Sequence, residues 1–210
     1  MFKISFLKLI LPSLTFLFFV SCAKESINIE DWIQENKTEK IINLSKKELG
    51  TLPATIGTLK NVEELTLQYD SLTEIPTELG NLTSLRILNL FGNPISNLPE
   101  SMENLENLEI LLLGRTKLTK VPTFLPKLKK LKTLALDETQ VSLTEADVEV
   151  LAQMPNLQIL DLTLLRNLKS LPKNLSKLSF LKELFLQKVP FEKSDVVRLR
   201  DELPGVRIKL

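Results

Sequence analysis

The residue types that most often perform catalysis are scarce in this chain of 210 residues. It contains no histidine and one cysteine, Cys22. Ser–His and Cys–His triads, histidine–zinc sites and histidine acid–base chemistry are therefore excluded, as are internal disulfides and Cys-x-x-Cys pairs. The 27 basic and 26 acidic residues balance, whereas a nucleic-acid-binding surface usually shows a strong basic excess. We therefore predict no nucleic-acid partner.

The single cysteine lies where a lipid could be attached to its thiol. Lys3 and Lys8 form a basic start, and Leu9–Val20 is an apolar run of twelve residues. A membrane-spanning helix needs roughly 20 apolar residues, so this run has the length of a secretory signal instead. With Ser21 and Cys22 following it, the segment resembles a bacterial lipobox. That resemblance implies cleavage before the cysteine and acylation of its thiol.

The segment differs from the usual lipobox at two positions. Phe19 stands where leucine is usual, and Val20 stands where alanine or serine is usual. An ordinary secretory signal followed by an incidental cysteine is therefore the alternative. We expect a signal peptide over residues 1–21 and a lipoprotein anchored through Cys22. Two or three acyl chains would hold the protein stably on a membrane. We expect this membrane to be the outer membrane or the cell surface rather than the inner membrane.

Leucine accounts for 46 of the 210 residues, and it recurs with a fixed period. Units of 23 residues carry apolar side chains at positions 1, 4, 6, 11, 14, 18 and 21 and proline at position 15. One unit cannot bury its own leucines, so stacked units must supply the core. The regular units begin at Val62, Leu85 and Leu108, an earlier one begins near Glu39, and less regular ones begin at Leu131, Leu157 and Leu181.

This pattern resembles the leucine-rich repeat family, specifically its short bacterial class, over about residues 39–210. The resemblance implies an α/β solenoid curved like a horseshoe, with a parallel β-sheet on its concave face. Extended or 3-10 segments and two α-helices would cover the convex face. The Leu-Pro pair favours such a return, because proline fixes φ and donates no hydrogen bond. We expect residues 22–38 to form a lipidated N-terminus, linker and cap, followed by about seven repeats, a C-terminal cap helix and an edge strand.

Some segments depart from the regular repeat and predict helices. Thr144 and Asp147 form a capping-box pattern that predicts an α-helix over residues 145–153. Ser194 is expected to cap a second helix, and Val206–Leu210 is expected to be the final strand. A further group of apolar residues near the N-terminus has helical spacing and is expected to cover the first repeat. This group consists of Ile29, Trp32 and Ile33.

Two local features concern the turns and the last strand. Family members usually carry asparagine at position 9, where its side chain bonds to neighbouring backbone, and here only Asn93 does so. We therefore expect a weak side-chain ladder and less regular turns. In the last strand, Arg207 and Lys209 are expected at positions 5 and 7, where their charge would protect an exposed edge from pairing with other chains.

The outward positions 3, 5, 7 and 8 of successive repeats form the face that could bind a partner. Two adjacent predicted strands carry four apolar side chains there, flanked by a tyrosine and an arginine, with two aspartates beyond. This composition resembles a protein-binding hot spot with a polar rim. The alternative is that the β-branched residues only pack against cross-strand neighbours. The candidate protein-binding residues are Tyr69, Ile87, Phe91, Ile110, Leu112, Arg115, Asp137 and Asp161.

Two groups of charged residues have weaker functional interpretations. Asp137, Glu138 and Asp161 could hold a hard cation such as calcium through oxygen ligands, but no calcium-loop motif is present. The lysine-rich segment 127–132 forms a basic strip. We interpret this strip as a solvated face, and contact with anionic lipid or polysaccharide is the alternative.

Nothing else in the sequence indicates an enzyme. It contains no phosphate-binding loop, nucleophile elbow or metal-ligand motif, and the repeats occupy nearly every residue after about position 39. We therefore predict no enzymatic activity, no cofactor and no metal. We expect a monomeric, membrane-anchored module that binds a protein partner through its concave face, with host proteins among the candidates. The alternative is a structural or scaffolding component of the cell envelope.

Overall fold

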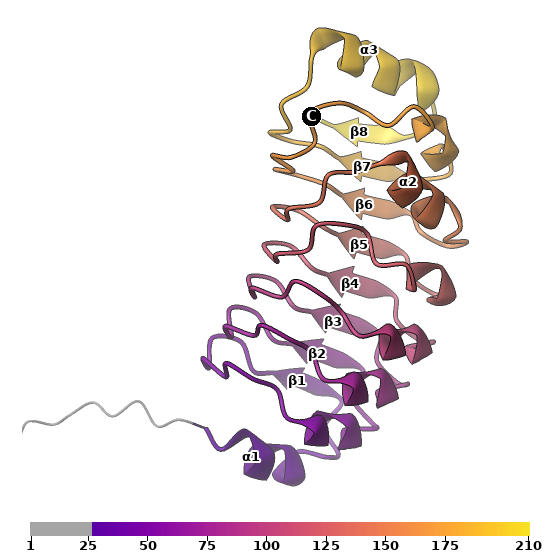
Figure 1. Ribbon diagram of the computed structural model, residues 1–210. Coiled ribbons are helices and arrows are strands. Elements are labelled where there is room, and N and C mark those ends of the chain that lie inside the picture. Colours follow the sequence, from indigo (N-terminus) through magenta and orange to yellow (C-terminus); the bar gives the residue numbers. More distant parts are fainter. Residues whose placement is uncertain (1–26) are drawn as a thin grey trace, which may run out of the picture.

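The computed structural model describes residues 27–210, so the predicted signal peptide and Cys22 lie outside the described residues. Eight short strands form one parallel sheet in which every strand pairs with the next one along the chain (Figure 1). The strands are β1 Ile41–Asn43, β2 Glu64–Thr66, β3 Ile87–Asn89, β4 Ile110–Leu112, β5 Thr133–Ala135, β6 Ile159–Asp161, β7 Glu183–Phe185 and β8 Arg207–Lys209. The predicted parallel solenoid is confirmed.

A short 3-10 helix forms part of the return path between most neighbouring strands. Pro53, Pro76 and Pro99 each have an extended conformation directly before a 3-10 helix, as the Leu-Pro pattern predicted. Figure 1 shows these helices stacked along one side of the sheet. They are η1 Ala54–Thr58, η2 Thr77–Asn81, η3 Glu100–Asn104, η4 Leu125–Lys127 and η5 Leu175–Leu178.

The core is a continuous column of leucines between the sheet and the returning segments. Leu65, Leu88, Leu111 and Leu134 occupy position 4 of successive repeats, pair in register and are completely buried. The residues on either side of them in each strand point the other way, because side chains alternate along a strand. Positions 3 and 5 therefore lie on the face of the sheet that is turned away from the core, which we call the concave face.

Three α-helices complete the solenoid, namely α1 Ile29–Glu35, α2 Glu145–Ala152 and α3 Lys193–Glu202. The predicted capping box of α2 is confirmed, since the backbone N–H of Thr144 donates to Asp147 Oδ2 at 2.9 Å. Asp147 Oδ1 also accepts from the backbone N–H of Val121 at 3.0 Å, which ties the helix to the preceding repeat. In α1, Ile33 is buried and Ile29 and Trp32 pack against the core.

Two predictions about the C-terminal end are wrong in detail. Ser194 does not cap α3, because the helix begins at Lys193 with Glu192 as its N-cap, and Asp195 Oδ2 accepts from the backbone N–H of Glu192 at 3.3 Å. Arg207 pairs with Glu183 at position 3, so the last strand is shifted by two residues from the predicted register. A shift of two preserves the alternation of side chains, and both basic residues of β8 are still exposed.

The turns after the strands are regular, so the predicted loss of regularity is wrong. Each repeat from β1 to β7 places a residue with positive φ at position 8. The side chain at position 9 is buried in four successive repeats although its type varies, and it bonds to backbone in each: the first two accept from N–H groups of the preceding repeat, and the two threonines donate to oxygens three residues before them. These position-9 residues are Asp70, Asn93, Thr116 and Thr139. Backbone pairing between repeats maintains the turn even without asparagine.

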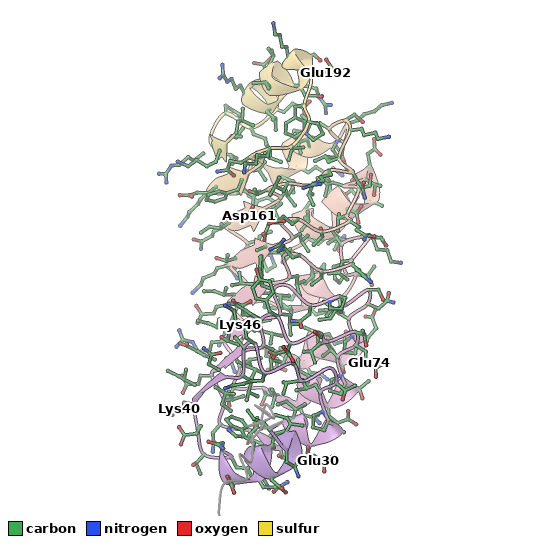
Figure 2. The ribbon with its side chains drawn as sticks, turned by 90° about the vertical axis from the view of Figure 1, so that its left-hand side faces the viewer. Glu30, Lys40, Lys46, Glu74, Asp161 and Glu192 are labelled. Atoms are coloured by element: carbon green, nitrogen blue, oxygen red, sulfur yellow. The ribbon has the colours of Figure 1, made fainter. Side chains whose placement is uncertain are left out.

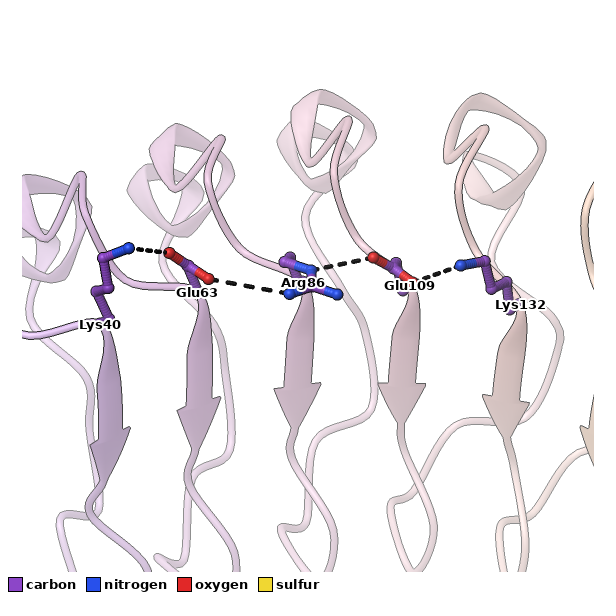
Figure 3. Close-up of polar contacts among 5 residues, drawn as sticks. All are labelled: Lys40, Glu63, Arg86, Glu109 and Lys132. Carbon is purple, nitrogen blue, oxygen red and sulfur yellow. Dashed lines mark hydrogen bonds and ion pairs between the residues drawn. The ribbon is translucent and has the colours of Figure 1, made fainter.

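A row of alternating charges runs along the start of the first five strands (Figure 3). Its closest contacts join Lys40 to Glu63 at 2.7 Å, Arg86 to Glu109 at 3.0 Å and Lys132 to Glu109 at 2.6 Å. Hydrogen bonds from these cations lower the pKa of both glutamates. The pairs are exposed, so each stabilises the fold only slightly, but opposite charges one repeat apart favour the observed register.

Candidate protein-binding surface

The candidate residues all lie on one part of the concave face or on the turns that follow it. Ile87 on β3 and Ile110 on β4 are register partners, and Leu112 lies beside Asn89. These three apolar side chains and Phe91 are half-buried. The predicted apolar patch therefore exposes less apolar surface than four fully exposed side chains would. We call the eight candidate residues the concave patch, and they are Tyr69, Ile87, Phe91, Ile110, Leu112, Arg115, Asp137 and Asp161.

Tyr69, Phe91 and Arg115 come from three successive repeats and form a cluster at one edge of the concave patch. The two aromatic rings meet edge to face, with centroids 5.4 Å apart and an interplanar angle of 76°. Arg115 Nη1 donates to the Tyr69 hydroxyl at 3.3 Å, and its guanidinium carbon lies 6.0 Å from the centroid of Phe91. These contacts hold an amphipathic surface in a defined conformation.

Two glycines provide the space for this cluster and for the neighbouring carboxylate. Gly92 has φ +76°, and a Cβ atom there would lie 2.5 Å from the ring of Tyr69. A Cβ atom at Gly114 would lie 2.3 Å from Asp137 Oδ1. Tyr69 therefore lies over Gly92, just beyond β3, and Asp137 lies over Gly114, just beyond β4. Sequence reasoning did not assign a role to either glycine, although both stand where other repeats carry larger side chains.

The acidic side of the concave patch consists of residues from neighbouring repeats. Burial and the charge of Asp161 raise the pKa of Asp137 to about 6. Asp161 Oδ1 accepts from the backbone N–H of Thr163 at 2.9 Å, and Glu138 pairs with Arg115 at 3.3 Å. Within residues 27–210, no three acidic, cysteine or histidine side chains gather in a way that could hold a metal ion, so the calcium alternative gains no support.

The basic strip is divided among separate contacts. Lys132 belongs to the charged row of Figure 3, and Lys130 donates to Asn107 Oδ1 at 2.6 Å. A hollow of about 510 Å³ beside the strip is lined by both lysines and glutamates, including Lys127 and Glu103. This mixed lining agrees with a solvated face and does not favour an anionic ligand.

A comparison with known protein families assigns the chain. A model described as a leucine-rich repeat region matches residues 77–203. The chain belongs to the leucine-rich repeat family. This confirms the resemblance drawn from the 23-residue period, and no curated protein gave a match.

Solved structures of other leucine-rich repeat proteins share the fold. A protein from Leptospira interrogans is 33% identical with a TM-score of 0.65, over 76% of this chain and 40% of that one. An internalin, InlF, from Listeria monocytogenes is 23% identical with a TM-score of 0.61, over 76% of this chain and 44% of that one. The plant peptide hormone receptor RGFR1, solved in complex with RGF2, is 23% identical with a TM-score of 0.62, over 85% of this chain and 29% of that one. This leucine-rich repeat chain thus spans less than half the length of these relatives.

Along the solenoid, the acidic side of the concave patch has a central position. Figure 2 shows Asp161 between Lys46, near the N-terminal repeats, and Glu192, near the C-terminal end. Among residues 27–210 of this leucine-rich repeat protein, no helix combines the length and the apolar character needed to cross a bilayer.

Proposed function

We propose that this leucine-rich repeat protein is a non-enzymatic module that binds a protein partner through its concave patch. The observation that carries the proposal is the cluster of Tyr69, Phe91 and Arg115 beside the apolar side chains of Ile110 and Leu112. Tyrosine and arginine are enriched in interface residues that contribute most to affinity, and such residues lie beside apolar contacts that exclude water. The receptor RGFR1, solved with RGF2, lends general support, because it uses the same fold.

The geometry of the cluster suits binding because its side chains are already ordered. Ordering a long side chain on binding costs about 0.5–1.5 kcal/mol, and Arg115 is already held by Tyr69 and Glu138. The turns that carry these side chains are joined from repeat to repeat by backbone hydrogen bonds, from Tyr69 N–H to the Phe91 oxygen at 3.0 Å and from Arg115 N–H to the Asp137 oxygen at 2.8 Å. A partner could therefore cover the patch without a large loss of conformational freedom.

We expect the double substitution Phe91→Ala and Leu112→Ser to weaken binding of a protein partner at least tenfold. Truncating an interface hot spot costs about 2 kcal/mol or more, and about 1.4 kcal/mol corresponds to a factor of ten. The measurement is surface plasmon resonance with a partner captured from surface and envelope extracts. The matched control is Phe180→Ala with Val197→Ser. These apolar side chains are exposed but lie outside the concave patch, in the turn after η5 and in α3. Equal affinity of the patch variant and the wild type would exclude the concave patch.

We further propose that Cys22 carries a lipid that anchors the protein to the outer membrane or the cell surface. The support is the position of the only cysteine two residues after the apolar run of the predicted signal, with the small residue Ser21 between them. We expect labelled palmitate to be incorporated into the wild-type protein and not into Cys22→Ala. Release of an unmodified wild-type protein would contradict this proposal.

The partner, with host proteins among the candidates, must be able to reach the anchored protein. Protease treatment of intact cells separates this proposal from the structural role in the envelope. Degradation of the protein on intact cells is expected for a surface module, whereas protection would favour an inward-facing envelope component.

A further inference from the structure

The carboxylates of the concave patch define the chemistry of the partner more closely than its apolar side chains do. Asp161 ends β6, and Asp137 lies two residues beyond the end of β5, the strand that pairs with it. Within residues 27–210, no lysine or arginine forms an ion pair with either carboxylate. Both are half-buried, so their negative charge is only partly compensated by water.

The nearest cation cannot compensate these carboxylates without breaking its own contacts. Arg115 lies in the repeat before Asp137, but its guanidinium pairs with Glu138 and donates to the Tyr69 hydroxyl. The charged groups that face Asp137 are Asp161, Glu138 and Arg115. Two of these three groups are negative, so the acidic side of the patch attracts a positive charge from outside the chain.

Gly114 brings this negative charge close to the apolar part of the patch. Because Gly114 has no side chain, the Asp137 carboxylate lies over Gly114, which follows Leu112, the last residue of β4, by two residues. Two residues along an extended chain span roughly 7 Å, so the carboxylate lies about that far from Leu112 along the repeat. Residues i and i+2 of an extended segment are about 7 Å apart on the same face, which matches this separation.

We propose, on the basis of the proposed function, that the partner is a polypeptide segment that presents a lysine or arginine to Asp137 and Asp161. An apolar side chain close to this basic residue covers Leu112 and Ile110. The basic residue relieves the repulsion between the two carboxylates, and the apolar one removes the aliphatic surface from water. The concave patch thus selects a basic residue next to an apolar one.

The experiment selects ligands for the full chain from random twelve-residue peptides displayed on phage. The selected peptides are expected to carry lysine or arginine within two residues of an apolar residue. Their synthetic copies should bind at least tenfold more weakly to Asp137→Asn with Asp161→Asn than to the wild type. Binding should also weaken between pH 7.5 and pH 5, because protonation of Asp137 removes the charge that the basic residue contacts. The control variant Glu103→Gln with Glu106→Gln removes two exposed charges in and beside η3 and should bind normally.

The outcomes separate this inference from the proposed function. Peptides that lose affinity for Phe91→Ala with Leu112→Ser, but lack basic residues or bind the Asp137→Asn, Asp161→Asn variant normally, would overturn the inference alone. Failure to select any peptide, or selection of peptides insensitive to both patch variants, would count against the concave patch as a binding site and so against both. Sensitivity to both variants, together with the basic residue, supports both.

Discussion

Replacing Gly80 by alanine should lower the free energy of unfolding by about 1–3 kcal/mol. A Cβ atom at this position would lie 2.2 Å from the backbone oxygen of Ser101 and 2.6 Å from its carbonyl carbon. Gly80 belongs to η2 and Ser101 to η3, so the clash joins two repeats. Glycine is therefore required because the returning segments of these repeats approach each other at backbone distance.

The backbone of η3 cannot easily move away from Gly80. Ser101 Oγ donates to the backbone oxygen of Thr77 at 2.6 Å, and Leu79 and Met102 on either side of the contact are completely buried. Separating the two helices would open the core beneath them, and an unfilled core volume is itself destabilising.

Urea unfolding followed by circular dichroism measures the effect. Gly205→Ala is the matched control, because a Cβ atom at Gly205 would meet no atom within 4 Å. The control variant should remain within about 0.5 kcal/mol of the wild type, as is usual for surface substitutions. If Gly80→Ala were as stable as Gly205→Ala, the close approach of η2 and η3 would not constrain the fold.

Replacing Asp70 by asparagine should raise the free energy of unfolding at pH 7 by about 1–3 kcal/mol. Asp70 is completely buried at position 9, where Oδ1 accepts from the backbone N–H of Lys47 at 2.7 Å. Its other oxygen, Oδ2, is buried without a hydrogen-bond partner. A buried carboxylate with an unpaired oxygen destabilises the folded state, because it has lost the water that solvates it.

The next repeat shows what an asparagine does at the same position. Asn93 Oδ1 accepts from the backbone N–H groups of Asp70 and Leu72, and Nδ2 donates to the backbone oxygens of Leu67 and Leu90 at 2.6 and 2.8 Å. The repeat period places the equivalent backbone oxygens around residue 70 as well. An asparagine there would replace the unpaired oxygen with a donor.

The stabilisation should depend on pH, because desolvation raises the pKa of Asp70 above its ordinary value of 3.8. A carboxyl group with a raised pKa in the folded state costs stability as pH rises from the unfolded pKa through the folded one. The advantage of Asp70→Asn should therefore be largest at neutral pH, shrink as pH falls through the raised pKa of Asp70, and level off below the unfolded pKa of about 4. Thermal unfolding at a series of pH values tests this.

The reciprocal substitution serves as the control for the asparagine prediction. Asn93→Asp should destabilise the fold at neutral pH, because it would place a carboxylate oxygen against the backbone oxygens of Leu67 and Leu90. An advantage of Asp70→Asn that persisted unchanged at acidic pH would show that the charge of Asp70 is not its cause.

The repeat pattern was sufficient to predict the fold because each anchored position serves one structural purpose. Residues such as Leu88 and Leu111 recur every 23 positions, so their burial and the register of their strands follow from the period. The capping box of α2 was also visible, because it depends on Thr144 and Asp147, which are close in sequence. The charged row from Lys40 to Lys132 was equally readable at position 2, although it was not predicted.

The sequence alone determined which residues lie on the concave face of the sheet, because strand alternation and the repeat period are local properties. Only the tertiary structure decided how those side chains meet. Tyr69 and Arg115 bond across 46 residues, and their contact depends on the room that Gly92 leaves for the ring. Asp137 lies over Gly114 for the same reason. Such contacts depend on side-chain direction and on the space between stacked repeats. The 23-residue period specifies neither.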